Sequence, residues 1–432
     1  MKLFDNMEVK NNTLYIDGVN TVDLAKKFGT PLYVVDEELV RDKCRRYYTS
    51  FKADSGINKV AYAGKAFLTL AMCQLINEEG LCLDVVSGGE LYTAYISKFP
   101  MNKIYFHGNN KTMDEIKMAV RLGAGKFVVD NIDEMKNINS IAGQENKIQD
   151  ILLRVTPGIE AHTHEYIRTG QIDSKFGFSI IDNKVEEAVE LALKLPNIKL
   201  SGFHSHIGSQ IFEVKPYCEE VDVMLSLIGK IQNRFNICIE ELDLGGGFGI
   251  YYVEGDKPKP IEEFCSIILK EAEKKAREIG INLPCLVIEP GRSIVGNAGT
   301  TLYTVGTIKE IPDIRKYVSI DGGMADNIRP ALYGARYECA VSNKVHSDNI
   351  ENVTIAGKFC ESGDILIENV ELPKIEKGDI LTVFTTGAYG YSMASNYNKA
   401  ERPAVVFASK SRVSLVCKRQ SLQDIIKGEL ML

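Results

Sequence analysis

The stretch Glu241-Leu242-Asp243-Leu244-Gly245-Gly246-Gly247-Phe248-Gly249 begins as a short strand-like run and ends in a glycine-rich turn. Runs of this kind, rich in apolar and β-branched residues, are typical of strands that are buried on both faces of a sheet. Seven further runs lie between residues 60 and 289: Val60–Ala63, Leu83–Val86, Ile104–Phe106, Phe127–Val129, Ile151–Val155, Ser201–His206 and Leu286–Glu289.

Helix-like stretches separate the strand-like runs. The clearest are Glu90–Lys98, Thr112–Leu122, Asn183–Leu195, Lys215–Asn233 and Ile261–Ile279. Strands that alternate with helices in this way indicate parallel βαβ units, and eight of them predict an α/β protein with a (β/α)8 TIM barrel. Such barrels carry their chemistry at the C-terminal ends of the strands, and phosphate commonly binds in the loops after strands seven and eight.

The sequence beyond the eighth run has a different pattern, which predicts a second, mostly β domain. Its strand-like runs are Thr300–Ile308, Tyr317–Ile320, Val353–Ile355, Ile380–Thr385, Pro403–Phe407 and Val413–Cys417, with one short helix at Ser421–Ile426. The N-terminal run Thr13–Ile16, followed by the turn Asp17-Gly18, cannot start the barrel and is expected to join this domain. We therefore expect a barrel over residues 36–290 and a β-rich domain formed by residues 1–35 and 291–432.

Composition excludes several classes of function. The net charge is −7 and the chain has no basic cluster, which argues against a nucleic-acid partner. No apolar run reaches the roughly 18 residues of a membrane span, and no signal-peptide pattern opens the chain. The ten cysteines are scattered without a C-x-x-C pair, as expected for reduced thiols in the cytoplasm.

Lys65 is the first candidate chemical group. It lies in Ala61-Tyr62-Ala63-Gly64-Lys65-Ala66, directly after the first strand-like run and among small residues. A lysine at a strand end is usually only a solvated charge. In a barrel mouth it is partly desolvated, which lowers its pKa and frees the amine for nucleophilic, Schiff-base chemistry.

The glycines at 245–249 have both a structural and a functional interpretation. They can form a tight strand-to-helix turn, or their backbone N–H groups can bind a phosphate that approaches closely because no side chains intervene. Their position after the seventh run favours the phosphate. Arg292, just past the eighth run, could hold an anion with its two-pronged guanidinium group.

Glu289 ends the apolar run Leu286–Glu289, where a buried carboxylate is costly without a partner. It could form a structural ion pair with an arginine, or it could hold a proton on a cofactor ring nitrogen so that the ring accepts electrons. His204 and His206 alternate and are expected on one side of their strand. They could be core histidines or ligands of a metal, but we favour one of them stacking on a planar cofactor ring and expect no metal site.

The order of these features resembles the fold type III pyridoxal-phosphate enzymes, the alanine racemase and ornithine decarboxylase group, along nearly the whole chain. Within this group the diaminopimelate decarboxylases are the most similar. The segments that carry the resemblance are Asp84–Leu91, His162–Gly170, Ser174–Gly177, Arg329–Tyr333, Cys360–Asp364 and Gly387–Tyr391. The most specific are Cys360-Glu361-Ser362-Gly363-Asp364 and His162-Thr163-His164-Glu165-Tyr166-Ile167.

The resemblance implies a role for each matching residue, with pyridoxal 5′-phosphate as the cofactor. Lys65 would bind it covalently, His206 would stack on its ring, and Glu289 would pair with the ring nitrogen. The phosphate would be bound by Ser209, Gly245, Gly246, Gly247, Gly291 and Tyr389, with Arg292 close by.

The resemblance also implies a substrate and a partner. Arg292, Arg329 and Tyr333 would hold a distal carboxylate, Glu361 would hold a distal ammonium, and Cys360 would donate a proton. Cys360 and Glu361 would reach the neighbouring subunit's site, so a head-to-tail homodimer is expected. The implied reaction is decarboxylation of meso-2,6-diaminopimelate to L-lysine, with the second amino-acid head of this small substrate recognised by the arginines.

Two alternatives remain at this point. One is a related decarboxylase for ornithine, arginine or carboxynorspermidine, although such enzymes tend to recognise a distal amine with acids, and Arg329 beside Tyr333 argues against them. The other is a non-catalytic barrel that carries pyridoxal phosphate. Such barrels usually lack a β domain and a segment like Cys360–Asp364.

Overall fold

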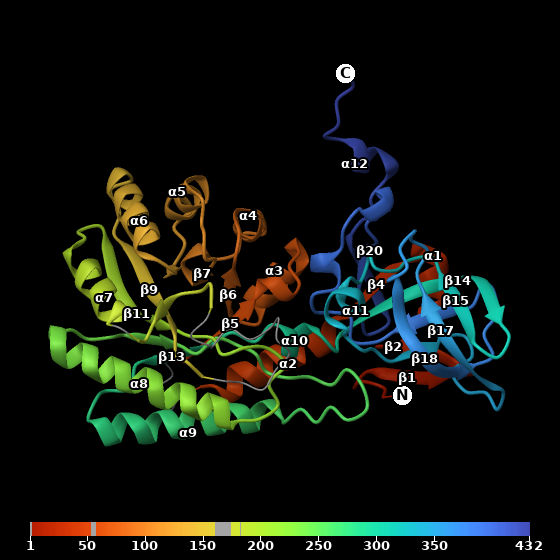
Figure 1. Ribbon diagram of the computed structural model, residues 1–432, viewed down its shortest axis with the longest axis horizontal. Helices are drawn as coiled ribbons and strands as arrows, with labels where there is room; N and C mark the ends of the chain where they lie inside the picture. The colour runs from red at the N-terminus through yellow and green to blue at the C-terminus, as the bar shows by residue number, and fades with distance from the viewer. Residues whose placement is uncertain (1, 53–57, 160–173, 182) are drawn as a thin grey trace. The chain divides into compact units, whose positions relative to one another are not determined.

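The computed structural model describes residues 2–52, 58–159, 174–181 and 183–432 (Figure 1). The segment His162–Gly170, which contributes to the resemblance, lies outside the described residues. The chain divides into a barrel unit (Lys43–Gly249 and Lys257–Gly291) and a β unit (Met1–Asp42, Ile250–Asp256 and Arg292–Leu432). The predicted division placed residues 36–42 and Ile250–Asp256 in the barrel. Both belong to the β unit, the second although it lies between two barrel elements in sequence.

The strands of the barrel unit form a closed parallel ring in the part of the chain that the structure describes. The ring runs β9-β11-β12-β13-β5-β6-β7-β8, and it closes because β9 also pairs with β8. A two-residue strand, β10 (Phe178–Ser179), pairs with the end of β9. The strands are β5 (Lys59–Ala63), β6 (Cys82–Val85), β7 (Ile104–Phe106), β8 (Lys126–Val129), β9 (Gln149–Thr156), β11 (Ile198–His204), β12 (Glu241–Asp243) and β13 (Cys285–Ile288). All eight predicted barrel strands are confirmed to within a few residues.

Helices connect these strands and flank the ring (Figure 1). The five predicted helices are confirmed; for example, the predicted Thr112–Leu122 begins one residue later because Thr112 caps its N-terminus in a reciprocal bond pair with Glu115. The helices are α2 (Glu37–Ser50), α3 (Leu70–Glu78), α4 (Gly88–Ile96), α5 (Met113–Leu122), α6 (Ile132–Gln144), α7 (Lys184–Lys194), α8 (Lys215–Phe235) and α9 (Ile261–Ile279), of which α2 spans the boundary between the two units.

Side chains from several strands fill the inside of the barrel. Ala61, Tyr105, Val128, Leu152 and Val287 form one buried apolar cluster, each from a different strand. The interior is therefore packed, as in other barrels of this kind, and polar side chains have room only near the strand ends.

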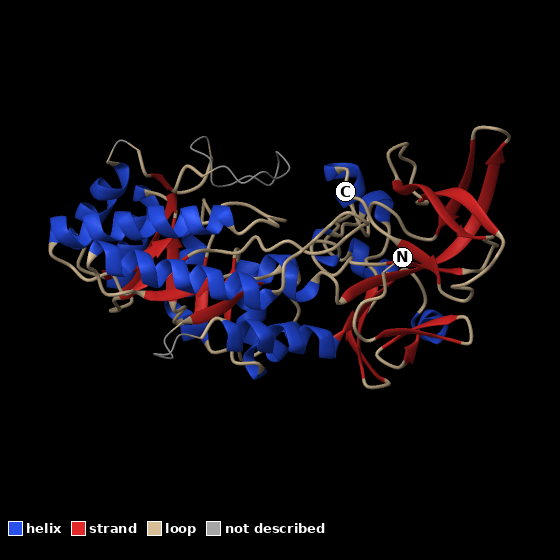
Figure 2. Ribbon diagram, turned by 90° about the horizontal axis from the view of Figure 1, so that it is seen from below, coloured by secondary structure: helices blue, strands red, loops and turns tan. Residues whose placement is uncertain are grey.

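The β unit consists largely of strands, whereas helices dominate the barrel unit (Figure 2). Its larger sheet has the order β18-β17-β15-β14-β4-β20-β21, with β19 pairing with both β14 and β16, and a small sheet has the order β1-β2-β3. The N-terminal residues belong here, as expected, since β4 (Leu32–Asp36) lies between β14 and β20. The other elements are β1 (Met7–Lys10), β2 (Thr13–Ile16), β3 (Val19–Asn20), α1 (Thr21–Phe28), α10 (Arg292–Val295), β14 (Gly299–Ile311), β15 (Arg315–Ile320), α11 (Arg329–Tyr333), β16 (Cys339–Val341), β17 (Ile350–Ala356), β18 (Ile365–Pro373), β19 (Ile380–Val383), β20 (Ala404–Ser409), β21 (Arg412–Cys417) and α12 (Leu422–Ile426).

The prediction missed β16 and β18 in the C-terminal part of the β unit, and β1, β3 and β4 in its N-terminal part. β16 has only three residues, and β18 contains Glu368, Asn369 and Glu371, which interrupt its apolar pattern. Because β18 lies at the end of the sheet path, part of it faces solvent and tolerates these polar residues. Conversely, the predicted run Ile380–Thr385 ends early, at Val383, and Thr385 has a φ of 57° that does not continue a strand.

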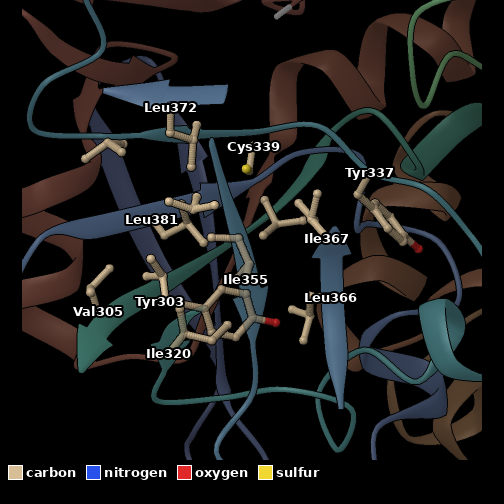
Figure 3. Packing of buried hydrophobic residues seen from close by; sticks show 14 of the residues in the cluster. Tyr303, Val305, Ile320, Tyr337, Cys339, Ile355, Leu366, Ile367, Leu372 and Leu381 are labelled. Carbon is tan, nitrogen blue, oxygen red and sulfur yellow. The ribbon is translucent and has the colours of Figure 1, made fainter. Parts of the chain in front are cut away.

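A large apolar cluster packs inside the β unit (Figure 3). Tyr303 and Val305 of β14, Ile355 of β17 and Leu381 of β19 pack in this core. Ile250 and Tyr252 belong to it as well, which explains why Ile250–Asp256 is part of this unit. None of the helices in the described parts of the chain is long and apolar enough to cross a membrane.

Candidate active site

Lys65 lies directly after β5, in a single helical turn that spans Gly64–Ala66. A Cβ at Gly64 would come within 2.8 Å of the Asp84 carbonyl oxygen, so glycine allows this turn to approach β6 closely. The Lys65 side chain is 38% exposed, and its Nζ lies 3.9 Å from Asp84 Oδ2. Lys65 is therefore an accessible amine near a buried carboxylate, at the strand end where it was predicted.

Glu289 lies directly after β13 and is buried among histidines. Its Oε1 is 2.7 Å from His107 Nε2, and its Oε2 is 3.4 Å from His204 Nε2. Burial raises the pKa of Glu289, but His107 and His204 outweigh burial and lower it well below its ordinary value. Glu289 is therefore ionised, and its partners are histidines rather than the arginine considered from the sequence.

Three residues of this cluster were missed in the sequence. His107 directly follows β7, Asp84 lies in β6, and Arg154 lies in β9 with its guanidinium 4.2 Å from the ring centre of Phe176. Burial raises the pKa of Asp84 and lowers the pKa of Arg154. Their signal was the one that identified Lys65 and Glu289: a polar residue at or beyond the end of a barrel strand.

His107, His204, Asp243 and Glu289 also form a group whose donor atoms lie within 4.8 Å of one another. Such a group could hold a metal ion. His107 Nε2 and Glu289 Oε1 are 2.7 Å apart, within ion-pair distance, although neither atom has a hydrogen-bond partner of acceptable geometry among the described residues. Burial lowers the pKa of His204 to about 3, which makes it a neutral imidazole at physiological pH.

His206 is separated from His204 by the end of the strand. β11 ends at His204, which is buried next to Glu289, whereas the half-buried His206 lies beyond the strand and accepts a 3.3 Å hydrogen bond from Gly246 N. The expectation that both rings extend from one strand was therefore wrong. Removal from water, together with the cations of Lys65 and Arg154, lowers the pKa of His206 well below its ordinary value.

The glycine turn after β12 approaches the neighbouring strand ends very closely. Gly245 and Gly247 have φ values of 63° and 102°, and a Cβ at Gly246 would lie 2.2 Å from the Glu289 carbonyl oxygen. Two of the three predicted phosphate-binding amides are engaged within the protein, because Gly245 N donates to Asp243 Oδ1 and Gly246 N donates to His206 Nδ1.

Gly247 and Gly291 are better placed to bind an anion. Within the described parts of the chain, their N–H groups donate to no protein acceptor. A Cβ at Gly291 would lie 2.8 Å from Ala63 Cβ, so glycine allows this backbone to pack closely against the end of β5. Ser209 is half-buried in the loop after β11. An amine, an ionised carboxylate and two available amides are the groups that pyridoxal phosphate requires of a protein, so the barrel residues fit this cofactor.

The β unit contains a cluster of buried arginines and tyrosines. Arg292 Nη1 donates to Tyr252 Oη over 2.6 Å, and Arg329 Nη1 donates to Tyr252 Oη over 2.9 Å and to Tyr337 Oη over 3.2 Å. Both guanidinium groups also lie over the ring of Tyr389, at 4.8 and 5.9 Å from its centre. The arginines outweigh burial and lower the pKa of Tyr252.

Arg329 is a buried cation. In the part of the chain that the structure describes, no carboxylate forms an ion pair with it, and its guanidinium lies 6.0 Å from the ring centre of Tyr333. Neighbouring phenol oxygens raise the pKa of Arg329 against the effect of burial, so it stays charged. A buried charge that lacks a partner is costly, which indicates that this cluster binds an anion.

Cys360 and Glu361 lie on an exposed turn of the β unit between β17 and β18. Cys360 N donates to Asn398 Oδ1 over 3.3 Å, and Glu361 Oε1 accepts a 3.3 Å bond from Gly363 N. Both side chains are accessible, as groups that serve a site on another chain would have to be.

Comparison with known families identifies the barrel. Residues 37–296 match the model of the family described as "Pyridoxal-dependent decarboxylase, pyridoxal binding domain". The chain is also similar to proteins named diaminopimelate decarboxylase. It is 48% identical to that of Bacillus subtilis (strain 168), over 96% of this chain and 95% of the relative, and 51% identical to that of Bacillus methanolicus, over 95% of each.

Solved structures agree with these relatives. The crystal structure of diaminopimelate decarboxylase from M. jannaschii has a TM-score of 0.93 and 37% identity to this chain, and covers 99% of this chain and 98% of its own. A second structure of that enzyme, in complex with L-lysine, has the same TM-score and 38% identity, with the same coverage. The chain therefore belongs to the diaminopimelate decarboxylase family of pyridoxal-dependent decarboxylases.

Proposed function

We propose that this protein uses pyridoxal 5′-phosphate to convert meso-2,6-diaminopimelate into L-lysine and CO2. The observation that carries the choice of substrate is the buried Arg329, which has no acidic partner among the described residues and shares Tyr252 with Arg292. Diaminopimelate has an amino-acid head at each end, so one carboxylate reacts while the other needs a cationic site.

The residues of the barrel end would hold the cofactor. Lys65 would bind it covalently, and Ser209 with the Gly247 and Gly291 amides would bind its phosphate, helped by the turn at Gly245 and Gly246. Arg292 and Tyr389 would add to the phosphate site, and His206 would contact the ring. The bound cofactor supplies an electron sink for the electron pair that is released when CO2 departs.

Two of the protein's own residues would then hold or donate a proton. Glu289, kept ionised by His107 and His204, would hold a proton on a neighbouring ring nitrogen. When the bond between Cα and the carboxylate breaks, CO2 leaves and Cα keeps the electron pair. Cys360 would donate its thiol proton to Cα and recover one from water.

Glu289→Gln is expected to slow decarboxylation at saturating substrate on the order of a hundredfold, because the neutral amide cannot stabilise the proton on the ring nitrogen. Single-turnover measurement of CO2 release tests this. Glu220→Gln is the matched control. Glu220 is also fully buried in the barrel unit, but burial raises its pKa to about 8, so its carboxyl group is protonated at neutral pH. Replacing this neutral acid with the neutral amide of glutamine therefore changes no charge. Equal rates for the two variants would assign Glu289 a structural role only.

Arg329→Ala is expected to weaken diaminopimelate binding by about 2–5 kcal/mol, the range for removing one side of a desolvated charge pair. The effect should be in KM or Kd, and the preference for diaminopimelate over a diamino acid that lacks the distal carboxylate should decrease. Arg315→Ala serves as control, since Arg315 is a half-buried arginine of the same unit that contacts the Tyr317 hydroxyl. An unchanged preference in Arg329→Ala would contradict the proposed substrate.

We also propose a homodimer in which Cys360 and Glu361 complete the site of the neighbouring subunit, with Glu361 binding the distal ammonium and Tyr333 assisting Arg329. The β unit also has a hollow of about 870 Å³, whose lining includes Pro330, Ala331, Ser362 and Gly363. Arg329 and Glu361 adjoin these residues in sequence, and this concave surface supports a role for the face in binding.

A related decarboxylase activity is the second candidate. A lysine/ornithine decarboxylase from Vibrio vulnificus shares the fold, with a TM-score of 0.77, but is only 22% identical to this chain. CO2 release from diaminopimelate, ornithine, arginine and carboxynorspermidine separates these activities. Absence of CO2 release from all four, with cofactor bound, would indicate a non-catalytic carrier instead.

A further inference from the structure

We propose that Asp364 is a positioning residue that fixes the turn carrying Cys360 and Glu361. Its consequence for catalysis rests on the proposed function, because it assumes that the Cys360 thiol donates a proton. The structural part of the proposal depends only on contacts within the β unit.

The Asp364 carboxylate connects two separate segments. Its Oδ1 accepts a 2.6 Å hydrogen bond from Met324 N, and its Oδ2 accepts a 2.9 Å bond from Phe359 N, directly before Cys360. The Asp364 backbone closes the same turn, since its N–H donates to the Glu361 carbonyl over 3.1 Å and its carbonyl accepts from Gly357 N over 2.9 Å. One residue thus ties both ends of the turn to the segment that contains Met324.

Two glycines make room for this carboxylate. A Cβ at Gly357 would lie 2.0 Å from Asp364 Oδ2, and a Cβ at Gly323 would lie 2.5 Å from Oδ1. Gly323 also has a φ of 151°, which disfavours other residues. The carboxylate is therefore enclosed by backbone on both sides, and its orientation is determined by this enclosure.

The burial of Asp364 contrasts with the exposure of the residues that it holds. Asp364 is 3% exposed, whereas Cys360 and Glu361 are both exposed on the surface. Exposed turns of this kind are mobile unless they are tied down, and a proton donor must be held in a narrow range of positions. Asp364 supplies a buried side-chain anchor for this exposed turn, in addition to the backbone bond from Lys358 N to the Gly322 carbonyl.

The carboxylate is required because both of its oxygens accept hydrogen bonds from backbone N–H groups. An asparagine has only one acceptor oxygen, so its amide group would face one of the two N–H donors. Asp364→Asn therefore keeps the size of the side chain and removes one of the two bonds. Gly357→Ala tests the same anchor without touching Asp364, since the new methyl group would displace Oδ2.

The test measures the alkylation rate of Cys360 by iodoacetamide in the holoenzyme, with the modified peptide quantified by mass spectrometry. Asp364→Asn and Gly357→Ala should each raise this rate severalfold and increase hydrogen exchange at the Phe359 and Met324 amides. Both should lower kcat on the order of tenfold with little change in KM.

Asp379→Asn is the matched control. Asp379 is also a buried carboxylate of the β unit that accepts a backbone bond, from Glu376 N over 2.7 Å, and a side-chain bond from Asn343 over 2.9 Å. This variant should lose comparable thermal stability without affecting Cys360. If Asp364→Asn and Gly357→Ala leave alkylation and exchange at the level of the control, the positioning role is refuted. If alkylation rises while kcat stays unchanged, Asp364 holds the turn but Cys360 is not the proton donor, and the proposed mechanism fails instead.

Discussion

Lys65→Ala is expected to reduce decarboxylation by a factor on the order of 10⁴ or more, because it removes the only group that the proposed chemistry uses as a nucleophile. The fold should persist, since the Lys65 side chain is 38% exposed and its Nζ lies 3.9 Å from Asp84 Oδ2, a long ion-pair distance. The measurement is CO2 release at saturating substrate, with far-ultraviolet circular dichroism to confirm folding.

A second readout does not depend on activity. After borohydride reduction of the wild-type holoenzyme, the cofactor should be attached to the peptide that contains Lys65, and no peptide of Lys65→Ala should carry it. Lys136→Ala, at an exposed lysine of α6, should behave like the wild type. Cofactor attached elsewhere in the Lys65→Ala chain would refute the assignment.

Mixing two inactive variants, Lys65→Ala and Cys360→Ala, is expected to restore activity if each site combines Lys65 of one subunit with Cys360 of its partner. In a mixed dimer, one site then has both wild-type residues and the other has neither. With equal amounts and random exchange, half of the dimers are mixed and half of their sites are intact, so recovery should approach about one quarter of wild-type activity in a twofold-symmetric dimer.

Subunit exchange must be verified by native mass spectrometry before the result is interpreted. The control mixes Lys65→Ala with Glu289→Gln, whose substitutions both belong to the barrel unit. In that mixture no site regains both barrel residues, so no recovery is expected beyond the residual rate of Glu289→Gln. If verified mixed dimers of the first pair remain inactive, the site is built within one chain and the shared-site proposal is wrong.

Much of the barrel could be predicted from local sequence. A strand buried on both faces must be short and apolar, and a helix between two such strands must present one apolar face, so β5–β9 and β11–β13 leave a clear pattern. Lys65 and Glu289 stood out because they interrupt or follow an apolar run, where a charge is costly without a function. The edge strand β18 left a weaker pattern because part of it faces water.

The residues around Glu289 could not be assigned in the same way. His107 follows the third barrel strand and Glu289 follows the eighth, and only the tertiary structure of the barrel brings their side chains to 2.7 Å. Likewise, the sequence suggested phosphate binding by the whole turn at 245–247. In the structure, however, the side chains of Asp243 and His206 accept hydrogen bonds from the backbone N–H groups of Gly245 and Gly246. Which N–H groups remain available depends on acceptors that come from other parts of the chain.

By itself, the sequence determined the alternation of strands and helices, the β-rich second unit and the strand ends that carry reactive groups. These three features follow from hydrophobic periodicity and from turn residues, and both signals act over only a few positions of the chain. Only the tertiary structure decided that Glu289 is paired with histidines, that Arg329 and Arg292 share Tyr252, and that Asp364 anchors the Cys360 turn. The physical reason is that the charge state and orientation of a buried polar group depend on the few atoms within hydrogen-bonding distance, and those atoms come from residues far apart in the sequence.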